Sequence, residues 1–323
     1  SSGMTDPFAR FGVEHLSATS MLQFRSDPAL GVLYLVFKIR EAGSPAMHRG
    51  SALDHTIGQM LEEGATLHQA GARAMATAHY DDLIENTDEK YHTSDIKRER
   101  GVVSRCLDEC YPIVSSWDIP AAYQHPIRLS LQGVEVPVVG FIDLRYPDAV
   151  RELKSSGKPR PGIVDDHAFQ VTTYAMAIRQ ESGAWPRAFV DYLTPSGMKS
   201  YQLMNGKRWV QEVVDTAAGI RACLSRLKTK TPSASSSRPI TATGCGAIGR
   251  TVSPQPRNSS ANNFLGQENS VEGADLFEAS ALDVRHRHAL CGIARHQNKK
   301  RPFVGRTAQH LIEKLHGVGR VRE

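Results

Sequence analysis

The apolar pattern changes its period in the middle of the chain, and this change restricts the fold more than any other feature of the sequence. Over residues 125–155 apolar and polar side chains alternate with a period of two, and turn residues interrupt the alternation at Gly133 and near Pro147-Asp148. Such alternation is typical of β-strands, and connections this short join strands that pair antiparallel. The sequence therefore predicts a meander of three strands over residues 125–132, 134–146 and 149–155.

The segments around the meander show the wider spacing of apolar residues that is typical of helices. After the meander, Asp165-Asp166 can cap a helix over 167–180, and an apolar strand over 188–193 follows it. A strand meander, a crossover helix and a further strand predict an α/β fold with a mixed central sheet flanked by helices. The other elements expected are helices over 20–25, 29–38, 45–79, 94–116 and 206–227 and a short strand over 199–203.

The composition shifts at about residue 229, where we expect the folded domain to end. In residues 231–270, 24 of 40 residues are Ser, Thr, Pro, Gly or Asn, so this stretch lacks the apolar surface that would offset the entropy of ordering it. We expect a domain over 4–228, a low-complexity linker over 229–270 and a basic C-terminal segment over 271–323. Residues 1–3 precede Met4 and are expected to be vector-derived.

The formal net charge of +5 is concentrated near the C-terminal end of the sequence. Residues 281–323 contain ten Lys or Arg and three Asp or Glu, a net of +7, so residues 1–280 carry −2. The basic balance is therefore weak evidence that the main domain binds nucleic acid. Five cysteines without regular spacing, and no apolar run of the roughly 20 residues that a membrane span needs, favour a cytoplasmic protein without a membrane partner.

Three charged residues fall on the last two strands of the predicted meander. Glu152 and Lys154 are two residues apart on one strand, so their side chains share one face of the sheet. Asp143 lies near the end of the preceding strand, and the short connection allows it to approach Glu152 across the ladder. Burying two carboxylates and an ammonium without partners would be very unfavourable, which indicates a functional site rather than a core.

A divalent cation would resolve the repulsion between Asp143 and Glu152. Carboxylate oxygens with open coordination positions suit Mg²⁺ or Mn²⁺, which keep water ligands and bind phosphate oxygens. Such an ion lowers the pKa of a bound water and stabilises charge on a phosphorane-like transition state. Lys154 beside it can orient or deprotonate that water and neutralise the scissile phosphate. The residues therefore favour metal-dependent hydrolysis of phosphodiester bonds.

The spacing of these residues resembles the active-site signature of the PD-(D/E)XK nuclease superfamily. Asp143 is followed, after eight intervening residues, by Glu152-Leu153-Lys154, and Gly140-x-x-Asp143 resembles the form found in the RecB-like branch. Two flanking segments resemble that branch as well. They are Gln170-x-x-x-Tyr174, which matches its Q-x-x-x-Y motif, and Arg49-Gly50-Ser51-Ala52-Leu53-Asp54, which resembles one of its opening helices.

The resemblance covers about residues 13–227 and is to phage-type RecB-like exonucleases. It implies a restriction-endonuclease-like core with the element order αβββαβ. It also implies that Mg²⁺ or Mn²⁺ supports hydrolysis of DNA during recombination, replication or repair, in a bacterial or phage-infected cell.

The resemblance also implies roles for individual residues. Asp143, Glu152 and the backbone carbonyl of Leu153 would bind the metal, and Lys154 would serve the attacking water. Asp54 would add a metal ligand or tune the site, while its neighbour His55 is expected to be structural. The residues expected to support the active site or to contact DNA are Arg49, Gln170 and Tyr174.

Two departures from the family pattern bear on these expectations. Ile142 stands where the proline of the family name would precede Asp143, a change that the RecB-like branch tolerates. Many relatives also hold an iron–sulfur cluster with one early and three late cysteines. Here Asp27 stands at the expected early position, and the late cysteines are scattered. We therefore predict no iron–sulfur cluster.

The sequence leaves three functions open. The first is an exonuclease, and the second is an endonuclease of restriction or structure-specific type, because the same catalytic residues serve both. The third is a non-catalytic DNA-binding scaffold, which the near-neutral main domain and the basic C-terminal segment permit. Cys106 and Cys110 lie four residues apart on a predicted helix and are expected to form a packed, reduced pair rather than half of a zinc site.

Overall fold

The computed structural model describes residues 6–40, 42–62 and 64–227. The predicted linker over 229–270 and the predicted basic segment over 271–323 lie outside the described residues, as do residues 1–3. The helices are α1 (Pro7–Arg10), α2 (Ala18–Ser26), α3 (Pro28–Val36), α4 (Pro45–Met60), α5 (Gln69–Glu85), α6 (Thr93–Val114), α7 (Asp165–Ser182) and α8 (Gly206–Arg226). The strands are β1 (Ala122–Leu129), β2 (Val138–Arg145), β3 (Ala149–Ser155), β4 (Arg187–Thr194) and β5 (Gly197–Gln202).

The strands form one mixed sheet in the order β1-β2-β3-β4-β5. The first three strands pair antiparallel as a meander, α7 crosses over to β4, and β4 pairs parallel with β3. The hairpin strand β5 completes the sheet antiparallel to β4. The predicted fold class, a mixed sheet flanked by helices, is therefore confirmed.

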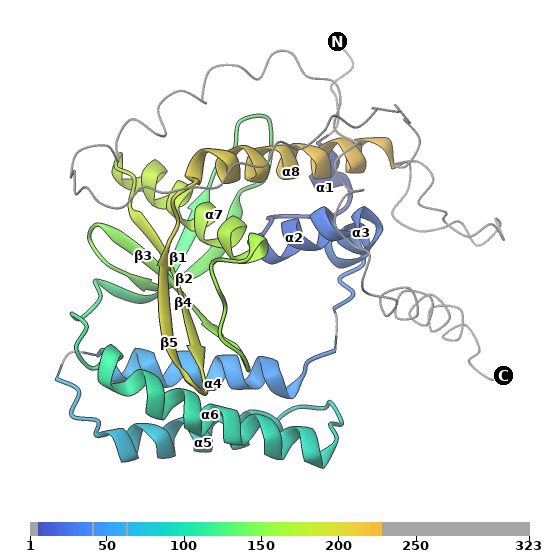
Figure 1. The fold of residues 1–323 in the computed structure, drawn as a ribbon. Helices are drawn as coiled ribbons and strands as arrows, with labels where there is room; N and C mark the ends of the chain where they lie inside the picture. The colour runs from blue at the N-terminus through green and yellow to red at the C-terminus, as the bar shows by residue number, and fades with distance from the viewer. Residues whose placement is uncertain (1–5, 41, 63, 228–323) are drawn as a thin grey trace, which may run out of the picture.

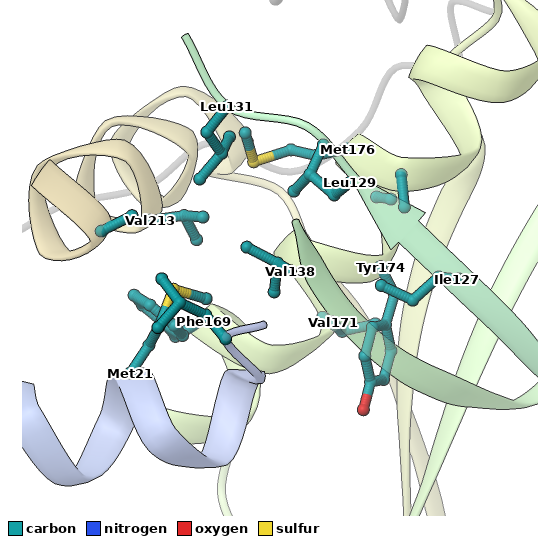
Figure 2. Packing of buried hydrophobic residues seen from close by; sticks show 14 of the residues in the cluster. Met21, Ile127, Leu129, Leu131, Val138, Phe169, Val171, Tyr174, Met176 and Val213 are labelled. Atoms are coloured by element: carbon teal, nitrogen blue, oxygen red, sulfur yellow. The ribbon is translucent and has the colours of Figure 1, made fainter. Parts of the chain in front are cut away.

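Helices cover both faces of the sheet, with α4, α5 and α6 on one side and α7, α8 and the N-terminal helices on the other (Figure 1). The first side buries a cluster that includes Leu144, Leu153 and Leu193. The second side buries a cluster that includes Ile142, Val150 and Val190, part of which is shown in Figure 2. Residues of a single strand thus face different helical layers, so β3 and β4 bury residues on both of their faces.

Strands β2 and β3 separate soon after they begin to pair. Their ladder contains Leu144 opposite Arg151 and Arg145 opposite Val150, and it ends there. Continued by one step, the same register would place Asp143 opposite Glu152. Asp143 and Glu152 therefore lie where the two strands part, and side chains rather than backbone hydrogen bonds fill the space between the strands there.

Two sequence predictions about helices are wrong. The stretch over 45–79 is two helices, α4 and α5, because the chain turns between Leu61 and His68. Asp165 and Asp166 do not cap α7 from outside. Val164 is the N-cap and makes no side-chain cap bond. Both acids lie in the first turn, where their negative charge interacts favourably with the positive end of the helix dipole. No helix among the described residues is both long and apolar enough to cross a lipid bilayer.

Candidate functional site

Helix α4 presents Asp54 to the sheet. Ser44 caps the helix by accepting a hydrogen bond from the backbone N–H of Met47, and Pro45 occupies the first turn, where its missing N–H costs nothing. Asp54 Oδ2 accepts hydrogen bonds from Tyr123 Oη at 2.8 Å and from Gln124 Nε2 at 2.9 Å. The second oxygen, Oδ1, is buried and has no hydrogen-bond partner. One oxygen of this carboxylate is therefore fixed, and the other is left available.

The two donors to Asp54 are consecutive residues of β1, which regular strand geometry would place on opposite faces of the sheet. Gln124 has φ of 50°, in the left-handed region that residues other than glycine rarely adopt. Its neighbours Tyr123 and His125 pair with Leu144 and Ile142, so Gln124 and Asp143 stand between two ladder pairs. This local distortion turns the side chains of Tyr123 and Gln124 toward α4. Strained backbone of this kind is concentrated at functional sites.

Gln124 also connects the helix to the sheet. The same Nε2 that donates to Asp54 donates to Asp143 Oδ1 at 3.0 Å. Asp143 Oδ2 accepts the backbone N–H of Leu153 at 2.7 Å, across the opening between β2 and β3. A single amide group therefore bridges two carboxylates, and the backbone of β3 holds the second of them from the other side.

Glu152 and Lys154 project together from β3. Lys154 Nζ donates to Glu152 Oε1 at 2.6 Å, while Glu152 Oε2 is buried without a hydrogen-bond partner. Glu152 is 3% exposed, so its charge is shielded from solvent and depends on its immediate neighbours. The prediction that these two side chains share one face of the strand is confirmed by this contact.

The acids of the site hold protons more tightly than free carboxylates do. Burial and the nearby charge of Asp143 raise the pKa of Asp54 to about 7. Burial and Asp143 likewise raise the pKa of Glu152 to about 8. Burial also raises the pKa of Asp143, although the N–H of Leu153 and the charge of Lys154 oppose the shift. Burial is the main cause of all three shifts, and the charge of Asp143 adds to it for Asp54 and Glu152.

Lys154 remains a cation in this environment. Burial alone would lower the pKa of its ammonium, but the Glu152 carboxylate in contact with it outweighs that effect, and the pKa is raised. The side chain therefore supplies positive charge rather than a free amine.

The donor set of the site suits a hard divalent cation. Asp54 Oδ1 and Glu152 Oε2 are buried acceptors without a donor, and unsatisfied acceptors of this kind are costly unless a cation or a proton reaches them. Among the described residues, however, no three His, Cys, Asp or Glu side chains are already arranged around a common point as a metal site. The amide of Gln124 lies between Asp54 and Asp143, and the ammonium of Lys154 contacts Glu152.

Gly140 and the Gln170-x-x-x-Tyr174 motif meet on the face of the sheet that α7 covers, the face from which Glu152 projects. A methyl group on Gly140 would lie 3.2 Å from Cε1 of Tyr174, so the glycine provides the room in which the tyrosine ring packs. The ring lies beside Ile127 and Val171 with its hydroxyl directed away from the apolar cluster (Figure 2). That hydroxyl accepts a hydrogen bond from Gln170 Nε2 at 2.8 Å, and burial together with the charge of Glu152 raises its pKa. Tyr174 thus lies near the acids, and Gln170 holds its hydroxyl.

Arg49 links three elements instead of facing solvent. Its Nη1 pairs with Glu99 of α6, and its Nε donates to Ser155 Oγ at 3.1 Å, at the end of β3. The side chain is largely buried, so it is held by protein groups. Of its two expected roles, support or DNA contact, this arrangement matches support, since it joins the helix of Asp54 to the strand of Glu152.

His55 and the cysteine pair lie away from the acids. The ring of His55 stacks on His79 with centroids 4.3 Å apart. Cys106 and Cys110 are buried in the apolar cluster under α6, and burial raises the pKa of each thiol to about 12. Both cysteines are therefore packed thiols.

The structure brings Asp54, Asp143, Glu152 and Lys154 together, with Gln170 and Tyr174 behind them. Sequence reasoning missed Tyr123 and Gln124, the two residues that hold Asp54. The predicted strand began at 125, and a regular strand would not have turned both side chains toward one helix. Their polar character just before the meander was the only available signal. The metal-ligand role of the Leu153 carbonyl stays a prediction, since the observed contact of Leu153 is its N–H.

Comparison with protein-family models finds no match for this chain, and comparison with curated proteins finds none either. Among solved structures, one of a "Putative exonuclease" from Eubacterium rectale is similar at 14% sequence identity, over 70% of this chain and 85% of that chain, with a TM-score of 0.44. The structure of SSO0001 is similar at 12% identity, over 53% of this chain and 84% of that chain, with a TM-score of 0.27. At TM-scores below 0.5 neither similarity assigns a family or an activity to this chain.

Proposed function

We propose that this protein is a metal-dependent nuclease that hydrolyses phosphodiester bonds of DNA. The observation that carries the proposal is the opening between β2 and β3, where Asp143 and Glu152 approach each other next to the ammonium of Lys154. Asp54 adds a third acid from α4, and two buried carboxylate oxygens lack donors. The order of these residues along the chain resembles the PD-(D/E)XK signature, which supports the same assignment.

Mg²⁺ or Mn²⁺ is the cofactor proposed, and when bound it would polarise the scissile phosphate and acidify the attacking water. The protein side chains that would hold it are Asp54, Asp143 and Glu152, with the carbonyl of Leu153 as a further ligand. No iron–sulfur cluster is part of the proposal. The raised pKa values of Asp54 and Glu152 fit this role, because carboxyls that bind protons against their normal tendency also gain most from a cation.

The remaining residues orient the carboxylates and supply positive charge. The N–H of Leu153 and the amide of Gln124 fix Asp143 from two sides, which orients its carboxylate toward the opening. Lys154, as an ammonium, would neutralise charge on the phosphate as it develops in the transition state. Tyr174 lies near Glu152, and Gln170 donates a hydrogen bond to the Tyr174 hydroxyl. Preorganised charge of this kind is usually the largest contribution to catalysis.

Cleavage of DNA is the direct test. The purified protein should degrade linear DNA with Mn²⁺ or Mg²⁺ and not with EDTA, and Asp143→Asn should abolish the activity. Asp88→Asn, which changes an exposed aspartate in the loop after α5, is the matched control and should retain the activity. An Asp143→Asn protein that degrades DNA at the parental rate would refute the assignment.

We propose an exonuclease, acting in recombination, replication or repair, on the basis of the resemblance to phage-type RecB-like exonucleases. An endonuclease would use the same acids, so the two activities must be distinguished by whether the DNA substrate is linear or circular. Cleavage of closed circular DNA at a rate comparable to that of linear DNA would exclude a strict exonuclease.

A non-catalytic scaffold is the third possibility. Isothermal titration of the protein with Mn²⁺ separates it from an enzyme, since a nuclease site should bind the ion and lose that binding in Asp143→Asn. Binding of DNA without any binding of Mn²⁺ would instead favour the scaffold.

A further inference from the structure

A small hollow lies between the connection from β3 to α7 and the hairpin of β4 and β5. Its volume is about 80 Å³. Its polar lining consists of Arg160 from the connection, Tyr192 and Thr194 from β4, and Ser196 and Lys199 from the hairpin. The lining therefore contains two cations and three hydroxyl groups, and it contains no carboxylate.

Strand register places this hollow in line with the catalytic lysine. Lys154 on β3 pairs with Tyr192 on β4, and Tyr192 pairs with Lys199 on β5. Residues directly paired across a sheet project from the same face, so the two lysines flank the tyrosine on one surface. Because neighbouring strands are about 4.8 Å apart, the backbones of the two lysines are separated by roughly 10 Å. A nucleic-acid strand that passes Lys154 would therefore reach the hollow within a nucleotide or two.

Hydrogen bonds fix the shape of the hollow. Tyr201 Oη donates to the carbonyl of Arg160 at 2.6 Å, which ties the connection to β5. Tyr192 Oη accepts the N–H of Val164 at 3.2 Å and lies 2.8 Å from His167 Nδ1, at the start of α7. Thr194 Oγ1 donates to the carbonyl of Gly197 at 2.7 Å and closes the hairpin. The walls are thus held in place by the fold rather than by the residues that would bind a ligand.

The hollow has positive charge that the protein does not neutralise. Arg160 and Lys199 are exposed, and within the described part of the chain neither forms an ion pair. The nearest acids at the start of α7 are engaged elsewhere, since Asp165 lies 3.9 Å from Arg208 and Asp166 lies 3.6 Å from Arg25.

The state of His167 reflects this field. Burial first, and then the charges of Lys154 and Arg160, lower its pKa to about 4. Burial opposes charge of either sign, so only the smaller contribution of Lys154 and Arg160 reports the positive field around the hollow.

We propose that this hollow binds a phosphate group of a nucleic-acid strand, next to the phosphate that is hydrolysed at Lys154. Arg160 and Lys199 would donate to the phosphate oxygens, with Ser196 as a further donor, and guanidinium groups are well suited to this geometry. The proposal rests on the proposed nuclease function for the position of the strand. The phosphate is either a terminal one, which would select strand ends, or an internal one, which would hold the strand along the sheet.

The test measures binding without cleavage. Fluorescence anisotropy in EDTA would compare single-stranded oligonucleotides that carry a phosphate at one terminus, at the other terminus or at neither. The test protein is the double variant Arg160→Ala with Lys199→Ala. The matched control is Arg105→Ala with Lys97→Ala, which removes the same charge from exposed positions on α6. Thermal melting would verify that both variants fold as the parent does.

We expect the test variant to bind about tenfold more weakly than the control, with a salt dependence reduced by about one phosphate contact. If the loss is confined to one phosphorylated terminus, the group bound is that terminal phosphate. If all three oligonucleotides lose affinity equally, the group bound is an internal phosphate. Equal affinities of the two variants would overturn the proposal, and so would a parent protein that binds none of the oligonucleotides.

The cleavage assay tests the nuclease assignment independently of the phosphate site. A parent that degrades DNA while the two variants bind equally would overturn the phosphate site alone. A parent that never degrades DNA, but loses affinity when Arg160 and Lys199 are replaced, would overturn the nuclease assignment and keep the phosphate site.

Discussion

Replacing Asp54 with asparagine should stabilise the metal-free protein, and the gain should grow with pH. The pKa of Asp54 is raised from 3.8 to about 7. Between these values the folded protein keeps the proton and the unfolded chain releases it, so the free energy of unfolding falls as pH rises. Three pKa units at about 1.4 kcal/mol each give a cost of about 4 kcal/mol above pH 7. Asparagine resembles the protonated acid and avoids this cost.

The assay is thermal unfolding in EDTA at a series of pH values from about 4 to 8. At about pH 4 the Tm values of the variant and the parent should differ little, because Asp54 is protonated in the folded protein and still partly protonated in the unfolded chain. Near pH 8 the variant should melt higher by roughly 10 °C, since 1 kcal/mol corresponds to about 2–4 °C in a domain of this size. Asp88→Asn, at an exposed position, should show no such gap at any pH.

Adding Mn²⁺ should narrow the stability gap between the two proteins, and at about 1,000 times Kd, where the gain is about 4.1 kcal/mol, it should close the gap. A ligand that binds only the folded state stabilises it by about 2.7 kcal/mol at a concentration of 100 times Kd. The parent should gain this stabilisation at pH 8, and Asp54→Asn should gain much less because one carboxylate oxygen is lost. A Tm difference that stays constant from pH 4 to 8 would refute the account of Asp54 as a buried, charge-deprived acid.

Three further substitutions test the supporting contacts. Gln124→Leu keeps a side chain with a Cβ at this position and removes the bridging amide. It should lower the stability of the metal-free protein by about 1.5–3 kcal/mol for each lost hydrogen bond to a carboxylate. Saturating Mn²⁺ should narrow that loss of stability in thermal melts. Gly140→Ala places a methyl group 3.2 Å from the ring of Tyr174 and should lower the free energy of unfolding in urea by about 1–3 kcal/mol. Gly157→Ala, with open space around it, should lower it by less than about 0.5 kcal/mol. Arg49→Met removes the buried partner of the Glu99 carboxylate, which keeps only its contact with the exposed Arg98, and should cost about 3–5 kcal/mol. Arg73→Met, in an exposed pair, should cost under about 1 kcal/mol by the same measurement. Equal costs for the two members of either glycine or arginine pair would contradict the packing described here.

The sequence predicted the parts of this fold that depend on neighbours along the chain. Strand β3 was predicted with its observed bounds, because alternation and turn residues are local signals. The shared face of Glu152 and Lys154 follows from their separation by two residues. The two errors in the helices were local as well, since the period of the apolar residues did not reveal the turn between α4 and α5.

The residues that complete the site depend on contacts between distant segments. Asp54 meets Tyr123 and Gln124 across 69 and 70 residues of sequence, and Arg49 meets Glu99 across 50. No periodic pattern encodes such pairings. Asp54 could be singled out beforehand only through a resemblance to a family, and nothing local indicated which residues would hold it.

By itself, the sequence determined the meander, the crossover to β4 and the pairing of an acid with a lysine on one strand, because backbone geometry fixes the period of side chains within an element. Tertiary structure alone decided that β2 and β3 part at Asp143, that Gln124 adopts a left-handed conformation, and that two carboxylate oxygens are buried without donors. These features depend on packing from both sides of the sheet, because α4 brings Asp54 to Gln124, and Glu152 is buried on the face that α7 covers, near Tyr174.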